Sequence, residues 1–501
     1  MILAGFAATL TGPALAAPML SSQRPPPRPG AASGASQAGA GAAPASSATR
    51  TVAKGADLVQ AARLGGQSGF AVIDGATGQV LDAYNGTTAL PPASVAKTMT
   101  TLYGLERLGA DYRFTTRVLA TGPVSGGIVQ GDLLLVGGGD PTLSTDDLGD
   151  LVARLAASGL RGVTGRFVVY ADRLPQIERL DDEQPVYAGY NPALSGLNLN
   201  FNRVHFEWTR AGGDWRLAMD ARAGRFVPPV QMATVRVVQR DLPLFTYDAG
   251  KLSDAWTVAA GGLGNGGSRW LPVRHPAAYT AEVFATLAAA QGITRLPPAT
   301  LVSGQPPATA TELGRHVSGP LSEILRDMLR HSTNLTAECV GLSASGEGGL
   351  AQSGQAMTQW AGARFGMGSQ FHDHSGLGGA SRTTPLDMAR ALRAADREGA
   401  GLRPLLREIG MRDMQGKPVK SSPVRVFAKT GTLNFCSGLA GYIVPPSGNP
   451  LVFAIFSADV PRRAALPPEQ REKPAGLAPW LARARNLQGQ LIAGWAQSYL
   501  T

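Results

Sequence analysis

The chain has 501 residues, of which 44% are hydrophobic and 16% are charged, and its 46 Lys and Arg outnumber its 36 Asp and Glu by ten. This length and apolar content predict two or three domains, or one domain with a large insertion, and they exclude a small disulfide-dependent protein and a wholly disordered one. The 2 cysteines are too few for a disulfide framework or a four-thiolate zinc site.

The N-terminal end is typical of a secretory signal followed by a tether. Residues 2–17 form an apolar run that ends in small residues, with Ala14 and Ala16 placed as a cleavage site, although the first basic residue is Arg24. The following segment is mostly Pro, Gly, Ala and Ser, a composition that cannot bury apolar surface. We expect residues 1–17 to be a signal peptide and residues 18–54 a flexible linker.

The elements that follow the linker suit an α+β domain. Patterning predicts a short helix over 55–65, hairpin strands at 69–74 and 79–84, and a helix that follows Pro92 and stops at Gly109.

The middle of the chain is rich in strand-like segments and poor in helices. Strands are predicted at 117–120, 131–136, 166–169, 204–208, 215–219 and 234–238, and helices at 148–158 and 279–292. The simplest account is a mostly β insert of one or two smaller domains inside a domain built from both ends of the chain. We therefore expect residues 55–112 and 306–501 to form one discontinuous domain and residues 113–305 to be inserted.

The C-terminal region completes the α+β pattern. Three short apolar segments joined by turn residues suit an antiparallel meander, and an amphipathic helix is able to cover one face of the resulting sheet. The strands are at 425–430, 437–444 and 451–459, and the helix is at 477–499. Beyond the N-terminus no apolar run approaches the roughly 18 residues that a spanning helix needs, so we expect no stable transmembrane anchor.

Basic residues are spread singly along the chain, and 39 of the 46 are Arg. They form no helix-long stripe and are not interleaved with aromatic residues, so we expect a solvated basic surface and no nucleic-acid partner. Cys339 and Cys436 lack an activating sequence context and are expected to be small core residues, with a disulfide between them as the alternative if the protein is exported. Because only 7 residues are Lys, a lysine inside a motif is informative.

The first motif with chemical meaning is Ser94-Val95-Ala96-Lys97, at the start of a predicted helix. A spacing of three brings both polar side chains to one helix face, so Lys97 can take the Ser94 proton once its ammonium is deprotonated. The helix N-terminus favours an alkoxide and a neutral lysine, and it offers a backbone donor for an oxyanion. Taken alone, the pattern also fits solvated helix residues.

The second motif is Ser332-Thr333-Asn334, between helical segments 321–329 and 335–342. A hydroxyl and an amide at such a junction can face a cleft, where one relays a proton and the other orients substrate or lysine. The alternative is an ordinary N-cap for the second helix.

The third motif is Lys429-Thr430-Gly431-Thr432, at the end of a predicted strand. Positive charge, hydroxyl donors and room for close backbone approach suit the anionic end of a peptide. Lys429 would also disfavour protonation of a nearby Lys97 through like-charge repulsion. The alternative is an edge strand protected by a lysine.

In the order S-x-x-K, S-x-N and K-T-G, each in its expected context, the three motifs resemble those of the penicillin-binding protein and serine β-lactamase superfamily. Lys97 and Ser332 are 235 positions apart. This long separation resembles that of the D-alanyl-D-alanine carboxypeptidase/endopeptidase family, the class C low-molecular-mass penicillin-binding proteins, which carry a large insert between the first and second motifs. The segments GGDPTL at 138–143 and NLNFN at 198–202, and the run KTGTLNFCSGLAGYI, agree with that family.

The resemblance implies a transpeptidase-like domain, an antiparallel sheet flanked by helices, with one or two inserted β-rich domains. It also implies a periplasmic serine enzyme without metal or cofactor that hydrolyses peptidoglycan stem peptides and is inhibited by β-lactams. In that family the motif positions make Ser94 the nucleophile, Lys97 the general base, Ser332 the proton relay and Asn334 a substrate-orienting residue. The resemblance also implies that the substrate is bound by Lys429, Thr430, Gly431 and Thr432.

One segment departs from the family. Asp373-His374-Ser375-Gly376-Leu377 resembles its D-G-S-G-L loop beside the active site, with His374 in place of a glycine. If that position needs a positive φ, histidine would reshape the loop. A metal site at His372, Asp373 and His374 lacks further ligands nearby in sequence, so we expect a structural or solvent-facing histidine.

Two alternatives remain at this level. An esterase or β-lactamase-like hydrolase would keep the chemistry and change the substrate, and a catalytically inactive peptidoglycan-binding protein would keep only the affinity. The family activity itself covers two outcomes, removal of terminal D-Ala and cleavage of crosslinks.

Overall fold

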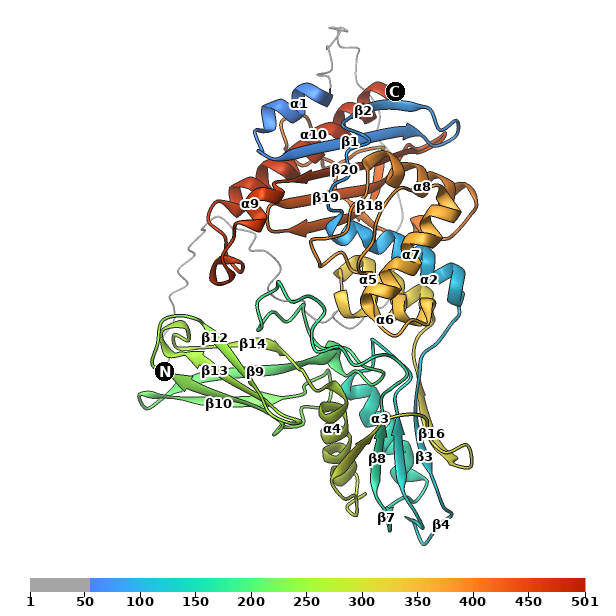
Figure 1. The fold of residues 1–501 in the computed structure, drawn as a ribbon, viewed down its shortest axis with the longest axis vertical. Helices are drawn as coiled ribbons and strands as arrows, with labels where there is room; N and C mark the ends of the chain where they lie inside the picture. The colour runs from blue at the N-terminus through green and yellow to red at the C-terminus, as the bar shows by residue number, and fades with distance from the viewer. Residues whose placement is uncertain (1–54, 501) are drawn as a thin grey trace, which may run out of the picture.

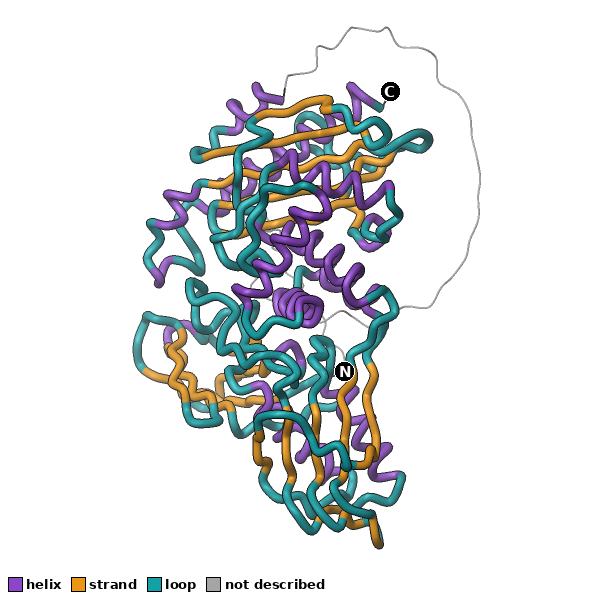
Figure 2. The backbone as a smooth tube through the Cα atoms, turned by 45° about the vertical axis from the view of Figure 1, so that its right-hand side comes forward, coloured by secondary structure: helices purple, strands orange, loops and turns teal. Residues whose placement is uncertain are grey.

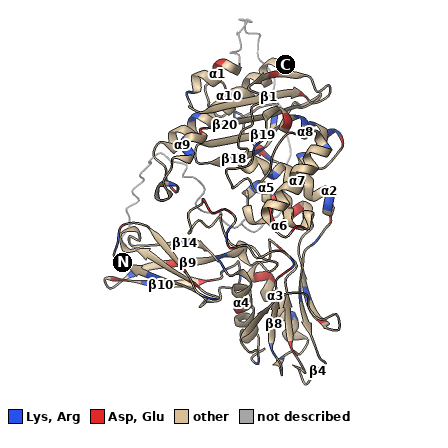
Figure 3. Ribbon diagram, in the orientation of Figure 1, with Lys and Arg blue, Asp and Glu red and all other residues tan. Residues whose placement is uncertain are grey.

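The computed structural model describes residues 55–500, so the expected signal peptide and linker lie outside the described residues. Between these limits, none of the helices combines the length and apolarity that a membrane-spanning segment needs. Basic and acidic residues are intermingled over the upper and the lower parts of the described chain (Figure 3).

A six-stranded antiparallel sheet, the type of sheet that the sequence predicted, pairs strands from the two ends of the described residues. Its order is β17-β18-β19-β20-β1-β2, and the expected meander β18-β19-β20 lies at its centre. Strand β1 pairs with β20 from Gln67 opposite Ala458 to Asp74 opposite Leu451. The strands are β1 (Gln67–Asp74), β2 (Val80–Tyr84), β17 (Arg407–Ile409), β18 (Arg425–Leu433), β19 (Cys436–Val444) and β20 (Leu451–Ala458).

Helices cover both faces of this sheet (Figure 1). Successive side chains of β1 point to opposite faces of the sheet, so Phe70 and Val72 belong to one apolar cluster while Ala71 and Ile73 belong to another. Both faces are therefore apolar and need to be covered. The first cluster is completed by α1 (Gly55–Ala62) and α10 (Leu477–Tyr499). The second is completed by α2 (Ala96–Leu108), α5 (Leu321–His331), α6 (Asn334–Ser345), α7 (Leu350–Phe365) and α8 (Pro385–Arg397). A short helix, α9 (Val460–Ala464), follows β20.

The insert is mostly β, as expected. Its main sheet has the order β15-β8-β6-β3-β16 and shares an apolar core with α3 (Thr145–Ala157) and α4 (Pro276–Ala290). Its strands are β3 (Thr115–Ala120), β6 (Leu133–Val136), β8 (Phe167–Tyr170), β15 (Ala299–Val302) and β16 (Thr311–Val317). The insert also has three smaller sheets of three strands each. The first consists of β4 (Val124–Ser125), β5 (Ile128–Val129) and β7 (Gly162–Val163), and the second of β9 (Arg203–Ala211), β10 (Asp214–Asp220) and β14 (Gly266–Pro272). The third consists of β11 (Ala233–Val238), β12 (Phe245–Ala249) and β13 (Asp254–Ala259).

Strands β3 and β16 connect the insert to the rest of the chain. Strand β3 follows α2, β16 precedes α5, and the two strands run side by side (Figures 1 and 2). They pair antiparallel, with Arg117 opposite Arg315. Because β16 lies after residue 305 and hydrogen-bonds within the sheet of the insert, we propose that the insert extends to Val317.

Both cysteines are buried core residues, as the sequence indicated. Cys339 lies in α6 and Cys436 begins β19, and both are free thiols. Burial raises the pKa of each thiol, so neither has the character of a reactive nucleophile.

Candidate active site

Ser94 and Lys97 lie on one short stretch of backbone that enters α2. Ser94 sits in a 3₁₀ turn, Ala93–Val95, which leads directly into the helix at Ala96. The Nζ atom of Lys97 donates a hydrogen bond to Ser94 Oγ over 3.0 Å. Ser94 is partly exposed and Lys97 is fully buried, so the hydroxyl is accessible while its partner amine is shielded from water.

Two further acceptors surround the Lys97 amine. Its Nζ atom donates to Asn334 Oδ1 over 2.8 Å and to the main-chain carbonyl of Ser375 over 2.6 Å. Burial lowers the pKa of Lys97 to about 7, against a smaller opposing effect of Glu338 and Asp373. A lysine in this state exchanges a proton near neutral pH, as a general base must.

Lys429 and Ser332 form a second pair. Lys429 Nζ donates to Ser332 Oγ over 3.0 Å and to the carbonyl of Thr430 over 2.8 Å. Burial lowers the pKa of Lys429 well below its usual value, and the charges of Lys97 and Arg407 add to this effect. Ser332 follows the last residue of α5 and has a φ of 58°, in the left-handed region. The chain therefore leaves the direction of the helix at this residue.

Two glycines allow the backbone to close around the Ser94 turn. A Cβ atom on Gly431 would lie 2.6 Å from the Pro92 carbonyl oxygen and 3.1 Å from the Ser94 nitrogen. A Cβ atom on Gly376 would lie 1.9 Å from the Ala93 oxygen, and Gly376 also has a φ of 70°. The edge of β18 and the loop after Asp373 therefore both touch the segment that carries the hydroxyl.

Two buried carboxylates hold the loop that supplies the Ser375 carbonyl. Glu338, in α6, accepts hydrogen bonds from the backbone nitrogens of His374 (3.0 Å) and Ser375 (2.8 Å). Asp373 accepts from Gly376 (2.5 Å) and Gly378 (2.8 Å). Burial raises the pKa of Glu338 to about 8 and also raises the pKa of Asp373.

His374 does not reshape this loop by its backbone. It is absent from the residues with positive φ, whereas the nearby Gly376 is among them, so the position tolerates a side chain. Room for the ring comes from α6, where a Cβ atom on Gly341 would lie 2.0 Å from the imidazole Cγ. The ring is fully buried, its Nε2 lies 2.6 Å from Ser353 Oγ, and burial lowers its pKa to about 3. His374 is therefore a neutral structural residue.

The structure brings the residues of the three motifs together, although up to 335 positions separate Ser94 from Lys429 in the chain. Lys429 and Gly431 are buried, while Thr430 and Thr432 are exposed on the alternate positions of β18. Sequence reasoning missed Glu338, which lies one helical turn after Asn334 and shares its helix face. It also missed Tyr190, whose main-chain oxygen accepts a hydrogen bond from Asn334 Nδ2 over 2.9 Å.

A cavity of about 300 Å³ adjoins this site. Pro91, before the Ser94 turn, and Asn434, just beyond Thr432, lie in its wall. The wall also contains Glu183 from the insert and Arg463 and Arg471 from the segment after β20. Residues that flank the first and third motifs therefore line a pocket built from both parts of the chain.

An antiparallel sheet between helices, with Ser-x-x-Lys, Ser-x-Asn and Lys-Thr-Gly converging at one edge, defines the transpeptidase-like class of penicillin-binding proteins. The sequence profile of the D-Ala-D-Ala carboxypeptidase 3 (S13) family matches residues 52–483. The chain belongs to this family of serine-type D-Ala-D-Ala carboxypeptidases.

Individual relatives agree with this assignment. The chain is 32% identical over 436 residues to a D-alanyl-D-alanine carboxypeptidase from an Actinomadura strain, covering 78% of each protein. It is 24% identical to a D-alanyl-D-alanine carboxypeptidase from Haemophilus influenzae, covering 80% of this chain and 87% of that protein. The crystal structure of penicillin-binding protein 4 from Haemophilus influenzae shares the fold, with a TM-score of 0.68 and 22% identity over 87% of this chain and 99% of that one.

Proposed function

We propose that Ser94 is the nucleophile of an acyl-transfer reaction that releases D-Ala from peptidoglycan stem peptides. Ser94 Oγ attacks the carbonyl of the penultimate D-Ala while neutral Lys97 takes the hydroxyl proton, the terminal D-Ala leaves, and water hydrolyses the resulting ester. The observation that carries this proposal is the 3.0 Å contact between Ser94 Oγ and the amine of a fully buried Lys97. A buried amine with a pKa of about 7 can accept that proton at neutral pH.

The second pair supplies the remaining steps. Ser332, 3.0 Å from Lys429 Nζ, would pass a proton to the departing amine, and Asn334 would orient substrate and Lys97. Lys429 with the exposed hydroxyls of Thr430 and Thr432 would bind the terminal carboxylate of the peptide. The backbone N–H groups of Ser94 and Thr432 would hold the oxyanion, which forms close to where β18 meets the Ser94 turn.

Membership of the family supports a proposal for the substrate and the location. We infer that the enzyme is exported and acts on peptidoglycan in the periplasm. We also infer that β-lactams acylate Ser94, since the Haemophilus influenzae structure has also been determined with a β-lactam. Residues 55–112 with the C-terminal part of the chain would form the catalytic unit. The cavity that contains Arg463, Arg471 and Glu183 would receive residues of the peptide that precede D-Ala-D-Ala, in carboxypeptidase or endopeptidase cleavage.

The decisive experiment is labelling of the folded protein with fluorescent penicillin, followed by peptide mass mapping. We expect one adduct, on the peptide that contains Ser94, and no adduct in Ser94→Ala. Absence of an adduct in the wild type would instead favour a catalytically inactive peptidoglycan-binding protein.

Turnover separates the remaining hydrolases. A carboxypeptidase should stay trapped by penicillin and should release D-Ala from a peptide that ends in D-Ala-D-Ala. Rapid clearance of penicillin would favour a β-lactamase-like enzyme, and cleavage of simple esters without release of D-Ala would favour an esterase.

A further inference from the structure

A second cavity, of about 350 Å³, lies on the main sheet of the insert. It shares no wall residue with the cavity next to Ser94. Tyr112 and Arg113, which connect α2 to β3, belong to its wall, so it lies where the insert joins the domain that carries Ser94. The sheet itself contributes residues of four strands to the wall: Thr115, Arg117, Val136, Tyr170, Glu312 and Arg315.

The cavity lies on the face of this sheet that is opposite α3 and α4. The strand register places Arg315, Arg117, Val136 and Tyr170 in one row across the sheet, since each is directly opposite the next. Side chains at opposed positions lie on the same face. Val118, one position further along β3, belongs to the apolar core that α3 and α4 complete. The apolar cluster around Val136 contains only strand and loop residues among those that the structure describes, so helices leave this face open to a ligand.

The wall of the cavity contains more positive than negative groups. The two acidic residues in it are already engaged. Glu312 Oε1 accepts a hydrogen bond from Arg315 Nε over 2.5 Å, and Asp172 Oδ2 accepts from the Gly304 nitrogen over 2.7 Å. Four arginines against these two acidic residues leave an excess of two positive charges: Arg113, Arg117, Arg173 and Arg315.

Three of the guanidinium groups lack a carboxylate partner. Arg113 Nη1 donates to the main-chain oxygen of Ser318 over 2.7 Å, a contact that does not neutralise its charge. Within residues 55–500, the side chains of Arg117 and Arg173 make no hydrogen bond or ion pair. Arg117 is half-buried and Arg173 is exposed. The donors of these two side chains are therefore available to a ligand in the cavity.

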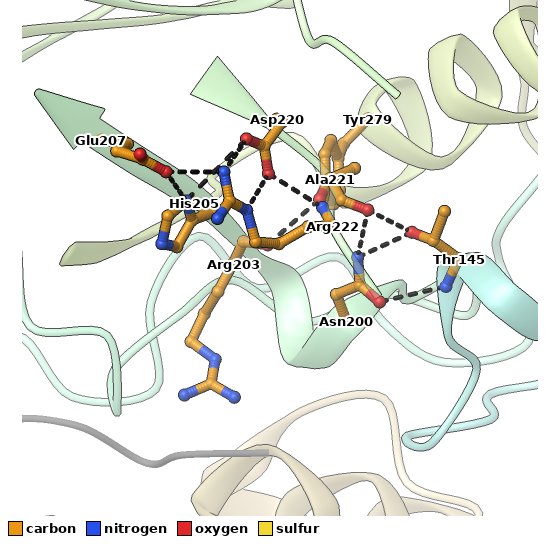
Figure 4. Close-up of polar contacts among 9 residues, drawn as sticks. All are labelled: Thr145, Asn200, Arg203, His205, Glu207, Asp220, Ala221, Arg222 and Tyr279. Carbon is orange, nitrogen blue, oxygen red and sulfur yellow. Dashed lines mark hydrogen bonds and ion pairs between the residues drawn. The ribbon is translucent and has the colours of Figure 1, made fainter. Parts of the chain in front are cut away.

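The surroundings of Arg117 differ from those of another half-buried arginine of the insert. Arg222 donates to Asp220 over 2.6 Å and to Glu207 over 2.8 Å, so its charge is neutralised within the fold (Figure 4). Arg117 instead lies directly opposite Arg315 on the neighbouring strand. Like charges at opposed positions destabilise a sheet, and a bound anion offsets that repulsion.

A carboxylate is a ligand group that these donors favour. The guanidinium fork of arginine binds a carboxylate through two parallel hydrogen bonds, and a concave surface with an excess of one charge attracts molecules of the opposite charge. The proposed substrate is a polymer that presents many carboxylates, because each uncleaved stem peptide ends in one. A protein that holds two groups of one polymer gains from effective concentration, so two weak contacts together give tight binding.

We propose that this cavity is a second binding site for peptidoglycan, which holds the carboxylate of one stem peptide while Ser94 acts on another. The inference rests on the proposed function for the identity of the polymer. Arg117 and Arg173 would bind the carboxylate, and Arg113 would add positive charge. The site would favour intact peptidoglycan over isolated stem peptides and would leave the chemistry at Ser94 unchanged.

The test compares a polymeric with a soluble substrate. For Arg117→Gln/Arg173→Gln we expect the KM for D-Ala release from insoluble peptidoglycan to rise at least about fivefold with kcat unchanged, because two charged donors are lost. Release of D-Ala from a soluble peptide that ends in D-Ala-D-Ala, and penicillin acylation, should stay as in the wild type. The matched control is Arg216→Gln/Arg236→Gln, which removes two exposed arginines from other sheets of the insert. It changes the net charge by the same amount and should leave the KM for peptidoglycan unchanged.

Binding is measured apart from cleavage, by sedimentation of the Ser94→Ala protein with the same peptidoglycan. Adding the substitutions of Arg117 and Arg173 should weaken this binding, and adding those of Arg216 and Arg236 should not. Failure of the Ser94→Ala protein to sediment, undiminished binding without Arg117 and Arg173, or an equal loss in the control would overturn the proposal.

Activity on the soluble peptide separates this inference from the proposed function. Slower release of D-Ala from the soluble peptide by Arg117→Gln/Arg173→Gln would show that the cavity acts on the Ser94 site, and would also overturn the proposal. A wild-type protein that releases no D-Ala from the soluble peptide would contradict the proposed function, while sedimentation would still test the cavity. Circular dichroism and the melting temperature establish that each variant is folded.

Discussion

The side-chain amide of Asn334 joins Lys97 to the insert. Its Oδ1 atom accepts a hydrogen bond from Lys97 Nζ over 2.8 Å, and its Nδ2 atom donates to the main-chain oxygen of Tyr190 over 2.9 Å. Tyr190 belongs to the insert, in the irregular segment between β8 and β9. The orientation of the amide, and with it one contact of the lysine, is therefore fixed by a residue of the insert.

Asn334→Asp should move the pH dependence of acylation. The substitution puts a carboxylate where Oδ1 lies 2.8 Å from Lys97 Nζ, and an opposite charge this close stabilises the ammonium. The pKa of Lys97 should rise from about 7 by one unit or more, so neutral lysine forms only at higher pH. The rate of penicillin acylation, measured from pH 5 to 10, should show its rising limb displaced to higher pH.

Asn434→Asp serves as the control for that experiment. Asn434 lies two positions beyond Thr432, and its Nδ2 atom donates to the carbonyl of Arg471 instead of contacting Lys97. We expect its rising limb to remain near that of the wild type. An unshifted limb in Asn334→Asp, with acylation still measurable, would remove Lys97 as the titrating base.

Lys97→Met should abolish acylation and change how stability depends on pH. The pKa of Lys97 is lowered to about 7 in the folded protein, against 10.5 for an ordinary lysine. Between these values the unfolded chain binds the proton and the folded chain does not, so this lysine makes stability rise with pH and fall as the pH drops toward 7. The methionine variant lacks this dependence.

Urea unfolding at pH 7, 8, 9 and 10 measures that difference. The free energy of unfolding of the wild type minus that of Lys97→Met should increase as the pH rises, by up to roughly 1.4 kcal/mol per pH unit. Lys473→Met, in an exposed side chain outside the site, is the control for the loss of a lysine. A flat difference for Lys97→Met would mean that Lys97 is protonated in the folded protein.

Gly431→Ala should reduce acylation by displacing the Ser94 turn. The added methyl group would lie 2.6 Å from the Pro92 oxygen and 3.1 Å from the Ser94 nitrogen, both of which are backbone atoms. Forcing such a contact costs about 1–3 kcal/mol, and we expect at least tenfold slower penicillin acylation. Gly348→Ala is the control, since a Cβ atom there meets nothing within 4 Å. Equal rates for the two variants would contradict the close packing of β18 on the turn.

The motifs were predictable because each is local. Ser94 and Lys97 are three residues apart, and the strand that carries Lys429 shows its own apolar pattern. The cause of the lowered pKa of Lys97 was not predictable in the same way. Repulsion by Lys429 was the expected cause, whereas burial is the largest one, and burial depends on packing against Asn334 and Ser375, 237 and 278 residues away.

The strands of the insert were also only partly predictable from local sequence. Strand β14 (Gly266–Pro272) begins with two glycines and ends with a proline, so local propensity opposes a strand, and pairing with β9 decides the outcome. The helix at Leu477–Tyr499, by contrast, has the predicted bounds because its apolar positions keep a helical period over 23 residues. The contact between Tyr190 and Asn334 uses a main-chain oxygen, which leaves no pattern in the side chains.

The packing of His374 against Gly341 predicts a compensating pair of substitutions. A Cβ atom on Gly341 would lie 2.0 Å from the imidazole Cγ, so Gly341→Ala alone should destabilise the protein by about 1–3 kcal/mol. His374→Ala alone should also destabilise it, because it leaves a cavity and removes the contact with Ser353 Oγ. In the double variant the new methyl group occupies part of the space that the ring vacates.

Urea unfolding of the two single variants and the double variant completes this cycle. The double variant should be more stable than the sum of the single effects predicts, by about 0.5–3 kcal/mol, since the two residues are in direct contact. Penicillin acylation by the double variant should approach the wild-type rate, because Glu338 still holds the backbone of residues 374 and 375. Strictly additive losses of stability would show that the glycine in α6 does not make the room that the histidine occupies.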